Sequence, residues 1–130
     1  MYAADGLGRA NWSFDFAYAV NTTACSTCRA FLRIDTDPSA LANVVDIDLT
    51  ALYGNSRADS WNMTMGFLAP IGFNAFAASS TDFTLFIRDT LGSQTPVLSS
   101  AITVKVPEPG SLALAGLALL GLFAARRRNA

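Results

Sequence analysis

The stretch WSFDFAYAV, residues 12–20, places a large apolar side chain at every second position. Small or polar residues occupy the positions between. Because successive side chains of an extended strand point to opposite faces, a period of two predicts a β-strand with one buried and one exposed face. An amphipathic helix would instead repeat its apolar residues every three or four positions. The stretch therefore indicates a β fold.

The same alternation recurs along the chain. It covers residues 45–49, 61–67, 83–87 and 102–106, with a weaker run at 30–35. Turn-forming residues separate the runs, at 21–23, 36–39, 53–56, 69–72 and 92–96. Six to eight short strands at this spacing predict a mainly β domain over residues 1–105, an antiparallel β-sandwich of the immunoglobulin-like kind.

The composition narrows the chemistry. The 130 residues include nine basic and ten acidic side chains and no histidine, for a net charge of −1. Without histidine there is no histidine-based catalytic triad and no histidine-ligated zinc or haem. The near-neutral charge argues against a nucleic-acid partner, and no acidic pair stands out as a glycosidase acid and nucleophile. We expect no enzyme activity and no cofactor.

Residues 106–130 form a second part of the chain. The stretch 111–125 carries no charge and no proline, and its leucines fall on all faces of a helix. Such a helix reaches roughly 22 Å, against a hydrocarbon core of about 30 Å, but flanking arginines lengthen an effective span by snorkelling. We expect a single C-terminal transmembrane helix whose arginines are cytoplasmic; the alternative is a helix packed on a soluble core. The anchoring side chains would be Leu112, Leu114, Leu117, Leu119, Leu120, Leu122 and Phe123.

The tripeptide Pro107-Glu108-Pro109 stands directly before this helix, and Arg126, Arg127 and Arg128 follow it as a stop-transfer signal. The prolines favour an extended, exposed peptide that cannot join the helix. A membrane-embedded processing enzyme could therefore reach it. In this order, residues 106–128 resemble the PEP-CTERM sorting domain of exported proteins in Gram-negative bacteria that make exopolysaccharide.

The resemblance implies that the chain is a substrate. Its partner would be exosortase, an integral-membrane cysteine peptidase, which would recognise Pro107, Glu108 and Pro109. The helix and the arginines would hold the chain in the inner membrane transiently, with the ectodomain in the periplasm. The processed protein would then reach the cell surface or the extracellular polysaccharide matrix.

Two other functions stay open from the sequence. One is a C-terminally anchored membrane protein that is never cleaved. The other is a carbohydrate- or ice-binding module, which predicts an exposed row of aromatic or threonine side chains. Export also needs an entry signal, and residues 1–9 contain no apolar signal-peptide region. We therefore expect the reading frame to begin upstream of Met1, so that the domain lacks its natural N-terminus.

Two further groups of residues are candidate sites. Cys25 and Cys28 flank a short loop between expected strands, which favours a local disulfide in an oxidising compartment. Free thiols and redox or intermolecular pairing are the alternatives.

Asp35 and Asp37, followed by Asp46 and Asp48, form two D-x-D pairs. Calcium sites use such carboxylates, so Asp35 and Asp37 are calcium candidates. The alternative is a turn followed by a solvated strand face, and the full EF-hand pattern is absent. We otherwise expect no metal site.

Overall fold

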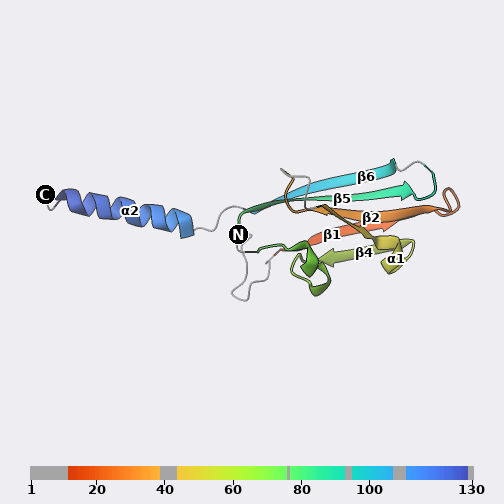
Figure 1. Ribbon diagram of the computed structural model, residues 1–130, viewed down its shortest axis with the longest axis horizontal. Helices are drawn as coiled ribbons and strands as arrows, with labels where there is room; N and C mark the ends of the chain where they lie inside the picture. The colour runs from red at the N-terminus through yellow and green to blue at the C-terminus, as the bar shows by residue number, and fades with distance from the viewer. Residues whose placement is uncertain (1–11, 39–43, 76, 93–94, 107–110, 129–130) are drawn as a thin grey trace.

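The structure, a computed structural model, describes residues 12–38, 44–75, 77–92, 95–106 and 111–128. Two antiparallel sheets lie in layers and a helix follows them at the C-terminal end of the chain (Figure 1). The elements in chain order are β1 (Phe14–Ala19), β2 (Cys28–Asp35), β3 (Val44–Asp48), α1 (Leu49–Tyr53), β4 (Ser56–Trp61), the 3-10 helix η1 (Gly66–Ile71), β5 (Ser79–Asp89), β6 (Pro96–Val106) and α2 (Ser111–Arg128).

β1 has the burial pattern that its period of two predicts. Phe14, Phe16 and Tyr18 are buried, and the residues between them are exposed. The strand pairs antiparallel with β4, so that Phe14 lies opposite Trp61. These two strands form the smaller sheet.

The larger sheet has the strand order β3-β2-β5-β6, and all of its neighbours are antiparallel. β2 and β5 are neighbours although the chain passes through β3, α1 and β4 between them. The prediction of a mainly β, antiparallel fold is confirmed. The immunoglobulin-like assignment is not, because among the described residues one of the two sheets contains two strands.

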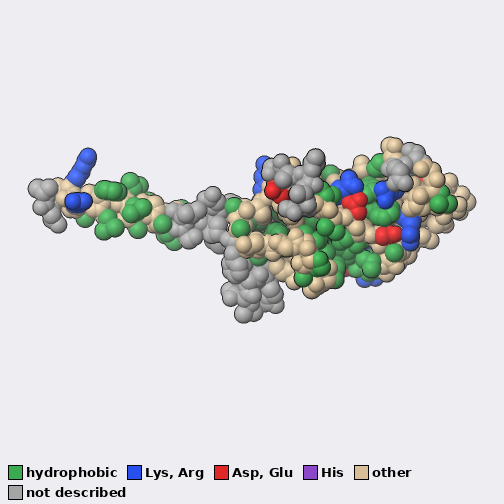
Figure 2. Space-filling view, viewed as in Figure 1, with side chains coloured by type: hydrophobic (Ala, Val, Ile, Leu, Met, Phe, Trp, Pro, Cys, Tyr) green, Lys and Arg blue, Asp and Glu red, His purple; other side chains and the backbone are tan. Residues whose placement is uncertain are grey.

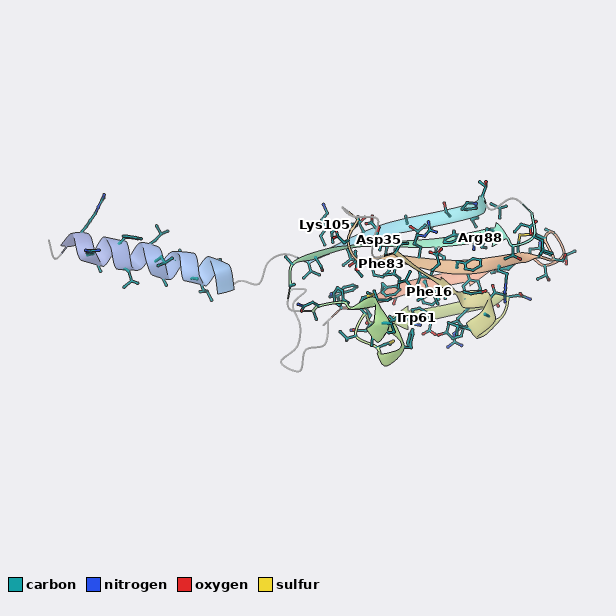
Figure 3. All side chains as sticks on the ribbon, viewed as in Figure 1. Phe16, Asp35, Trp61, Phe83, Arg88 and Lys105 are labelled. Atoms are coloured by element: carbon teal, nitrogen blue, oxygen red, sulfur yellow. A yellow bond between two sulfur atoms is a disulfide. The ribbon has the colours of Figure 1, made fainter. Side chains whose placement is uncertain are left out.

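Aromatic side chains fill the space between the sheets. The rings of Phe14 and Phe83 lie 4.2 Å apart, and those of Phe16 and Trp61 lie 4.8 Å apart at 80°. Figure 3 shows Phe16, Trp61 and Phe83 between the two layers. Each buried ring contributes about 1.5–3 kcal/mol through the hydrophobic effect, and each such pair about 0.5–1.5 kcal/mol more. These rings are the centre of a larger cluster of buried side chains, which reaches from Trp12 to Val106 and which we call the β-domain core. It holds β1 and β4 against the larger sheet.

The predicted strand at residues 45–49 ends one residue early. Asp48 caps a short helix instead, because its Oδ1 accepts a hydrogen bond from the backbone N–H of Ala51 at 2.9 Å. Leu49 begins α1 and is fully buried. A carboxylate at an N-cap stabilises the first helical turn, and here it overrides the alternation.

The strand that alternation predicts over residues 61–67 is wrong beyond Trp61, where β4 ends. Asn62 accepts hydrogen bonds from both the backbone N–H and the hydroxyl of Thr64, at 2.9 and 2.6 Å, and so forms a turn. Met63 stays buried, but Phe67, within η1, is 55% exposed. A local side-chain turn competes here with the strand.

Candidate functional site

β6 carries the chain from the sheets into the C-terminal segment. At its C-terminal end β6 pairs with β5, with Val104 opposite Thr81 and Val106 opposite Ser79. Val106 is 6% exposed and belongs to the β-domain core, while Lys105 lies on the exposed face. The chain is therefore fixed in the fold up to the residue before the predicted sorting motif.

The motif itself, Pro107, Glu108 and Pro109, lies outside the described residues. Its flanks are described: Val106 ends β6, and Ser111 begins α2. The predicted motif thus lies in the short interval between a strand with a buried end and a helix.

α2 is the helix that the uncharged stretch predicts, continued through the arginines to Arg128. From Ala113 to Arg127 every described side chain is exposed, and Figure 2 shows hydrophobic side chains along the helix with basic ones near its end. Leu114 and Leu122 are 69% and 67% exposed. The alternative of a helix packed on the core is therefore wrong for this structure.

The length and charge of α2 correct another prediction. Among the described residues, no helix combines the length and the apolar character needed to cross a membrane. Arg126–Arg128 form the last turn of α2 rather than a flank beyond it. The uncharged part reaches only roughly 22 Å, less than a hydrocarbon core of about 30 Å.

This finding does not support the predicted C-terminal transmembrane helix. The stop-transfer role of its arginines stays a prediction. The predicted inner-membrane anchoring is likewise not supported by the described part of the chain. The side chains predicted to anchor it were Leu112, Leu114, Leu117, Leu119, Leu120, Leu122 and Phe123.

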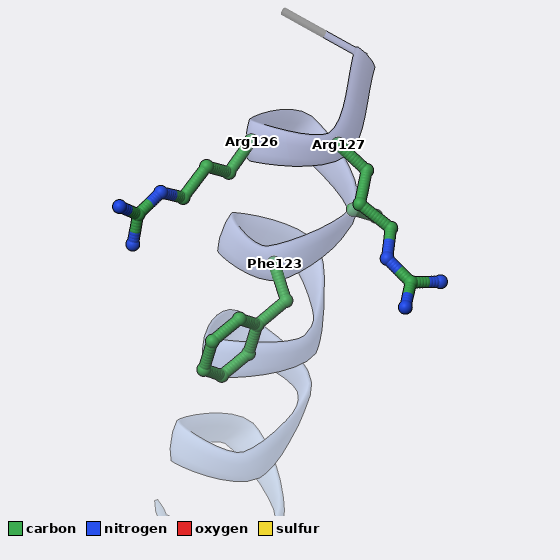
Figure 4. A pocket seen from close by; sticks show the side chains of 4 residues that line it. Phe123, Arg126 and Arg127 are labelled. Atoms are coloured by element: carbon green, nitrogen blue, oxygen red, sulfur yellow. The ribbon is translucent and has the colours of Figure 1, made fainter. Parts of the chain in front are cut away.

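The C-terminal turn of α2 presents two arginines in different directions. Figure 4 shows the guanidinium groups of Arg126 and Arg127 on opposite sides of the helix, with Phe123 a turn earlier. A shallow hollow lies against Phe123, Ala124, Arg126 and Arg127. A single exposed helix makes this hollow, so it has no enclosed wall to hold a small ligand.

Cys25 and Cys28 form a disulfide, with an S–S distance of 2.06 Å and Cα atoms 5.4 Å apart. The bridge closes the turn before β2, and Cys28 is 5% exposed against the β-domain core. In this state neither sulfur is a thiol that could act as a nucleophile or a metal ligand.

The loop between the two cysteines is also tied to the end of β5. The Thr27 hydroxyl donates to Asp89 Oδ1 at 2.6 Å, and the Thr27 carbonyl accepts from the Thr90 hydroxyl at 2.9 Å. The Thr27 hydrogen bond lowers the pKa of the Asp89 carboxyl below its usual value, since it stabilises the charged form. These contacts give the disulfide loop a structural role at one end of the sheets.

The calcium candidates make a turn. Asp35 Oδ1 accepts from the backbone N–H of Asp37 at 3.0 Å, at the end of β2. Among the described residues, no group of three or more cysteine, aspartate, glutamate or histidine side chains lies close enough to hold a metal ion. Within the described residues, Asp35 and Asp37 therefore have no third histidine, cysteine or carboxylate side chain close enough to complete a metal site.

The other two aspartates are partners of arginines on β2. Asp46 receives two hydrogen bonds from Arg33, at 2.7 and 2.8 Å, and Asp48 lies 3.0 Å from Arg29. The hydrogen bond to Asp46 raises the pKa of the Arg33 guanidinium. The second D-x-D pair thus serves cross-strand ion pairs.

An aromatic–arginine stack on the outer face of the larger sheet escaped the sequence reasoning. Phe31 and Phe86 are directly opposite on β2 and β5, with rings 5.4 Å apart and nearly parallel. The guanidinium of Arg88 lies 4.6 Å from the Phe31 ring centre, and that of Arg33 lies 5.3 Å from Phe86. The interruption of alternation at Phe86 was the available signal.

The stack also bears on the carbohydrate- or ice-binding alternative. Phe31 and Phe86 are 8% and 4% exposed beneath the arginines, and the aromatic residues of β1 face the core. The described strands therefore carry no exposed aromatic row of the kind that this alternative predicts.

Comparison with known families agrees with the sequence motif. Residues 105–128 match the family model of the PEP-CTERM protein-sorting motif. No curated protein and no solved structure matches the chain. The predicted PEP-CTERM resemblance is confirmed for the C-terminal segment, and the match does not extend to β1–β5.

Proposed function

We propose that this protein is a substrate of exosortase-dependent sorting, with the strands β1–β6 as cargo and residues 105–128 as the signal. The match of that segment to the PEP-CTERM protein-sorting motif carries the proposal. The observed order supports it: a strand with a buried end, Pro107-Glu108-Pro109, an apolar helix and three arginines. The chain is acted upon and carries out no catalysis of its own.

The exposed surface of α2 supports a role in recognition. Since the helix is apolar on all sides and buries none of its described side chains, the surface that these side chains form is available to the sorting machinery. Enclosing one leucine in an apolar site contributes about 1.5–3 kcal/mol. The arginines at the end of α2 would stay in water or meet acidic groups, which sets the direction in which the helix is held.

The chemistry of the tripeptide supports its role as the recognition motif. Pro107 and Pro109 have no backbone N–H, and Glu108 is the only acidic residue after Val106. A peptidase that reads one negative charge between two prolines would distinguish this site from the rest of the chain. We place processing near this motif, followed by release to the cell surface or the extracellular polysaccharide matrix.

The test is the intact mass of the surface form in cells that contain exosortase. We expect the wild-type surface form to have lost Arg126–Arg128. A variant with Pro107→Ala, Glu108→Ala and Pro109→Ala should keep them, because the recognition groups are gone. Pro96→Ala is the matched control, since it removes an exposed proline outside the motif and should be processed normally.

A surface form that keeps Arg126–Arg128 in the presence of exosortase would contradict the proposal. So would a protein whose mass and location stay the same when the exosortase gene is deleted. Either result would favour the alternative in which the tail is never cleaved.

A further inference from the structure

The inner face of β6 is buried at its end, where Val106 is 6% exposed, but around Leu98 and Ile102 it lacks the cover that the central strands have. On β2, Leu32 and Ile34 are at most 2% exposed, and Phe83 on β5 is also 2% exposed. Ile102 of β6 is directly opposite Phe83, yet it is 50% exposed, and Leu98, opposite Ile87, is 65% exposed. Over this part of the sheet, burial therefore falls off from β2 to β6.

The composition of the smaller sheet explains this gradient. Of the described strands, only β1 and β4 form the opposing layer. β1 packs on β5 through Phe14 and Phe83, with ring centres 4.2 Å apart. The layer ends there, so β6 extends past β1 by the width of one strand, about 4.8 Å.

An apolar groove follows from this offset. It has a volume of about 230 Å³, and its walls come from β1, β2, β5 and β6. Its lining is apolar apart from Asp15 and Ser100, and includes Phe16, Phe83 and Ile102.

The edge of β1 forms one side of this groove. β1 pairs with β4, and no strand within the described residues pairs with its other edge. Such an edge presents a row of backbone N–H and C=O groups that can pair with another strand. Asp15, near the start of β1, is exposed, and no ion pair or hydrogen bond of its carboxylate is found within the described residues.

We propose that the free edge of β1 and the uncovered face of β6 bind an extended segment of another polypeptide by strand addition. The segment pairs with the backbone of β1 and lays its alternate apolar side chains over Ile102 and Phe16. A lysine or arginine on its outward face pairs with Asp15 across the strands. The site is separate from the C-terminal signal and does not depend on the proposed sorting.

An added strand fits this site better than a rigid second copy. Because β6 projects past β1, two copies that approach through this edge would meet at β6 before their β1 edges could pair. The site instead needs backbone groups to pair with β1 and apolar side chains to cover Ile102 on β6. A single strand meets both demands, since it supplies backbone groups for β1 and apolar side chains for β6.

The experiment uses the full chain and two synthetic peptides. The first peptide alternates valine with threonine and carries one lysine on its threonine face. The second has proline in place of two central residues and cannot complete the ladder. We expect calorimetric binding of the first peptide, with slower amide hydrogen exchange in Phe14–Ala19, and no binding of the second.

A pair of variants locates the site on β6. Ile102→Lys puts a charge in the groove and should weaken binding about tenfold or more, the equivalent of losing one buried isoleucine contact. Ala101→Lys puts the same charge on the opposite face of the same strand and should leave binding unchanged. Both positions are exposed, so both variants should fold.

Three outcomes would overturn the proposal. Equal binding of both peptides would mean nonspecific apolar contact. Equal weakening by the two lysine variants would place the contact elsewhere. Slow exchange of the β1 amides before any peptide is added would mean that this chain covers its own edge.

Discussion

Tyr18 ties β1 to the segment around α1. Its hydroxyl lies 2.9 Å from the carbonyl oxygen of Leu49 and 2.8 Å from that of Gly54 and donates its proton to them. Gly54 has a φ of +84°, a conformation that favours glycine, and it turns the chain from α1 into β4. One phenol thus holds both ends of the helix against the first strand.

Replacing Tyr18 by phenylalanine should lower the free energy of unfolding by about 1–2 kcal/mol, because the buried carbonyl of Leu49 and the part-buried carbonyl of Gly54 lose their donor. The change is best measured by urea unfolding at neutral pH. A loss much smaller than this would mean that water replaces the hydroxyl.

The same variant should alter stability at alkaline pH. Burial, and secondarily the charge of Asp48, raises the pKa of the Tyr18 phenol above its usual value of about 10. As the pH rises, Tyr18 therefore ionises in the unfolded chain before it ionises in the folded one. Its contribution to the free energy of unfolding is complete below about pH 10 and is lost as the pH rises through the folded-state pKa. Tyr18→Phe should lose less stability over that window than the wild type, and an identical slope would contradict the assignment.

At the scale of elements, α1 completes the hydrogen bonding of β2. The ladder between β2 and β3 runs from Asp35 to Phe31 and stops there. The next residue of β2, Ala30, is fully buried, and its backbone N–H donates to the Thr50 hydroxyl at 2.8 Å. Through Thr50, α1 therefore supplies an acceptor for the Ala30 N–H, which a longer β3 would otherwise have paired.

Thr50→Val should cost about 1–3 kcal/mol of unfolding free energy, since it keeps the shape but leaves the Ala30 N–H unpaired. Amide exchange at Ala30 should become faster in the same variant. Thr50→Ser keeps the acceptor and serves as the control. Equal stability of the valine and serine variants would show that the hydrogen bond contributes nothing.

At the scale of the whole molecule, the β1–β6 fold and α2 are energetically separate. None of the described side chains of α2 is buried, whereas the end of β6 contributes Val106 to the core. A helix that exposes leucines on every side leaves a large apolar surface in water, which favours association.

A chain ending at Val106 should therefore unfold within a few degrees of the full chain and sediment as a monomer. The full chain should self-associate. A chain ending at Ala101 is the control: it also removes Val104 and Val106 and should unfold at a lower temperature. A large loss of stability in the chain ending at Val106 would show that α2 packs on the sheets.

Much of the molecule was determined by the sequence itself. Strand alternation gave the antiparallel β fold, and the order from Pro107 to Arg128 gave the sorting motif. Both are properties of neighbouring residues: side chains alternate along an extended backbone, and a linear signal is read along the chain.

Only the tertiary structure decided the rest. It replaced a strand end by α1 and a strand by η1, because Asp48 and Asn62 offer local hydrogen bonds that compete with alternation. It placed Arg88 over Phe31 and left Ile102 half exposed beside an edge of β1 that no described strand pairs with, since strand partners are chosen between residues far apart in sequence. Alternation tells which face of a strand is apolar, but only the packing of the two layers tells whether that face is covered.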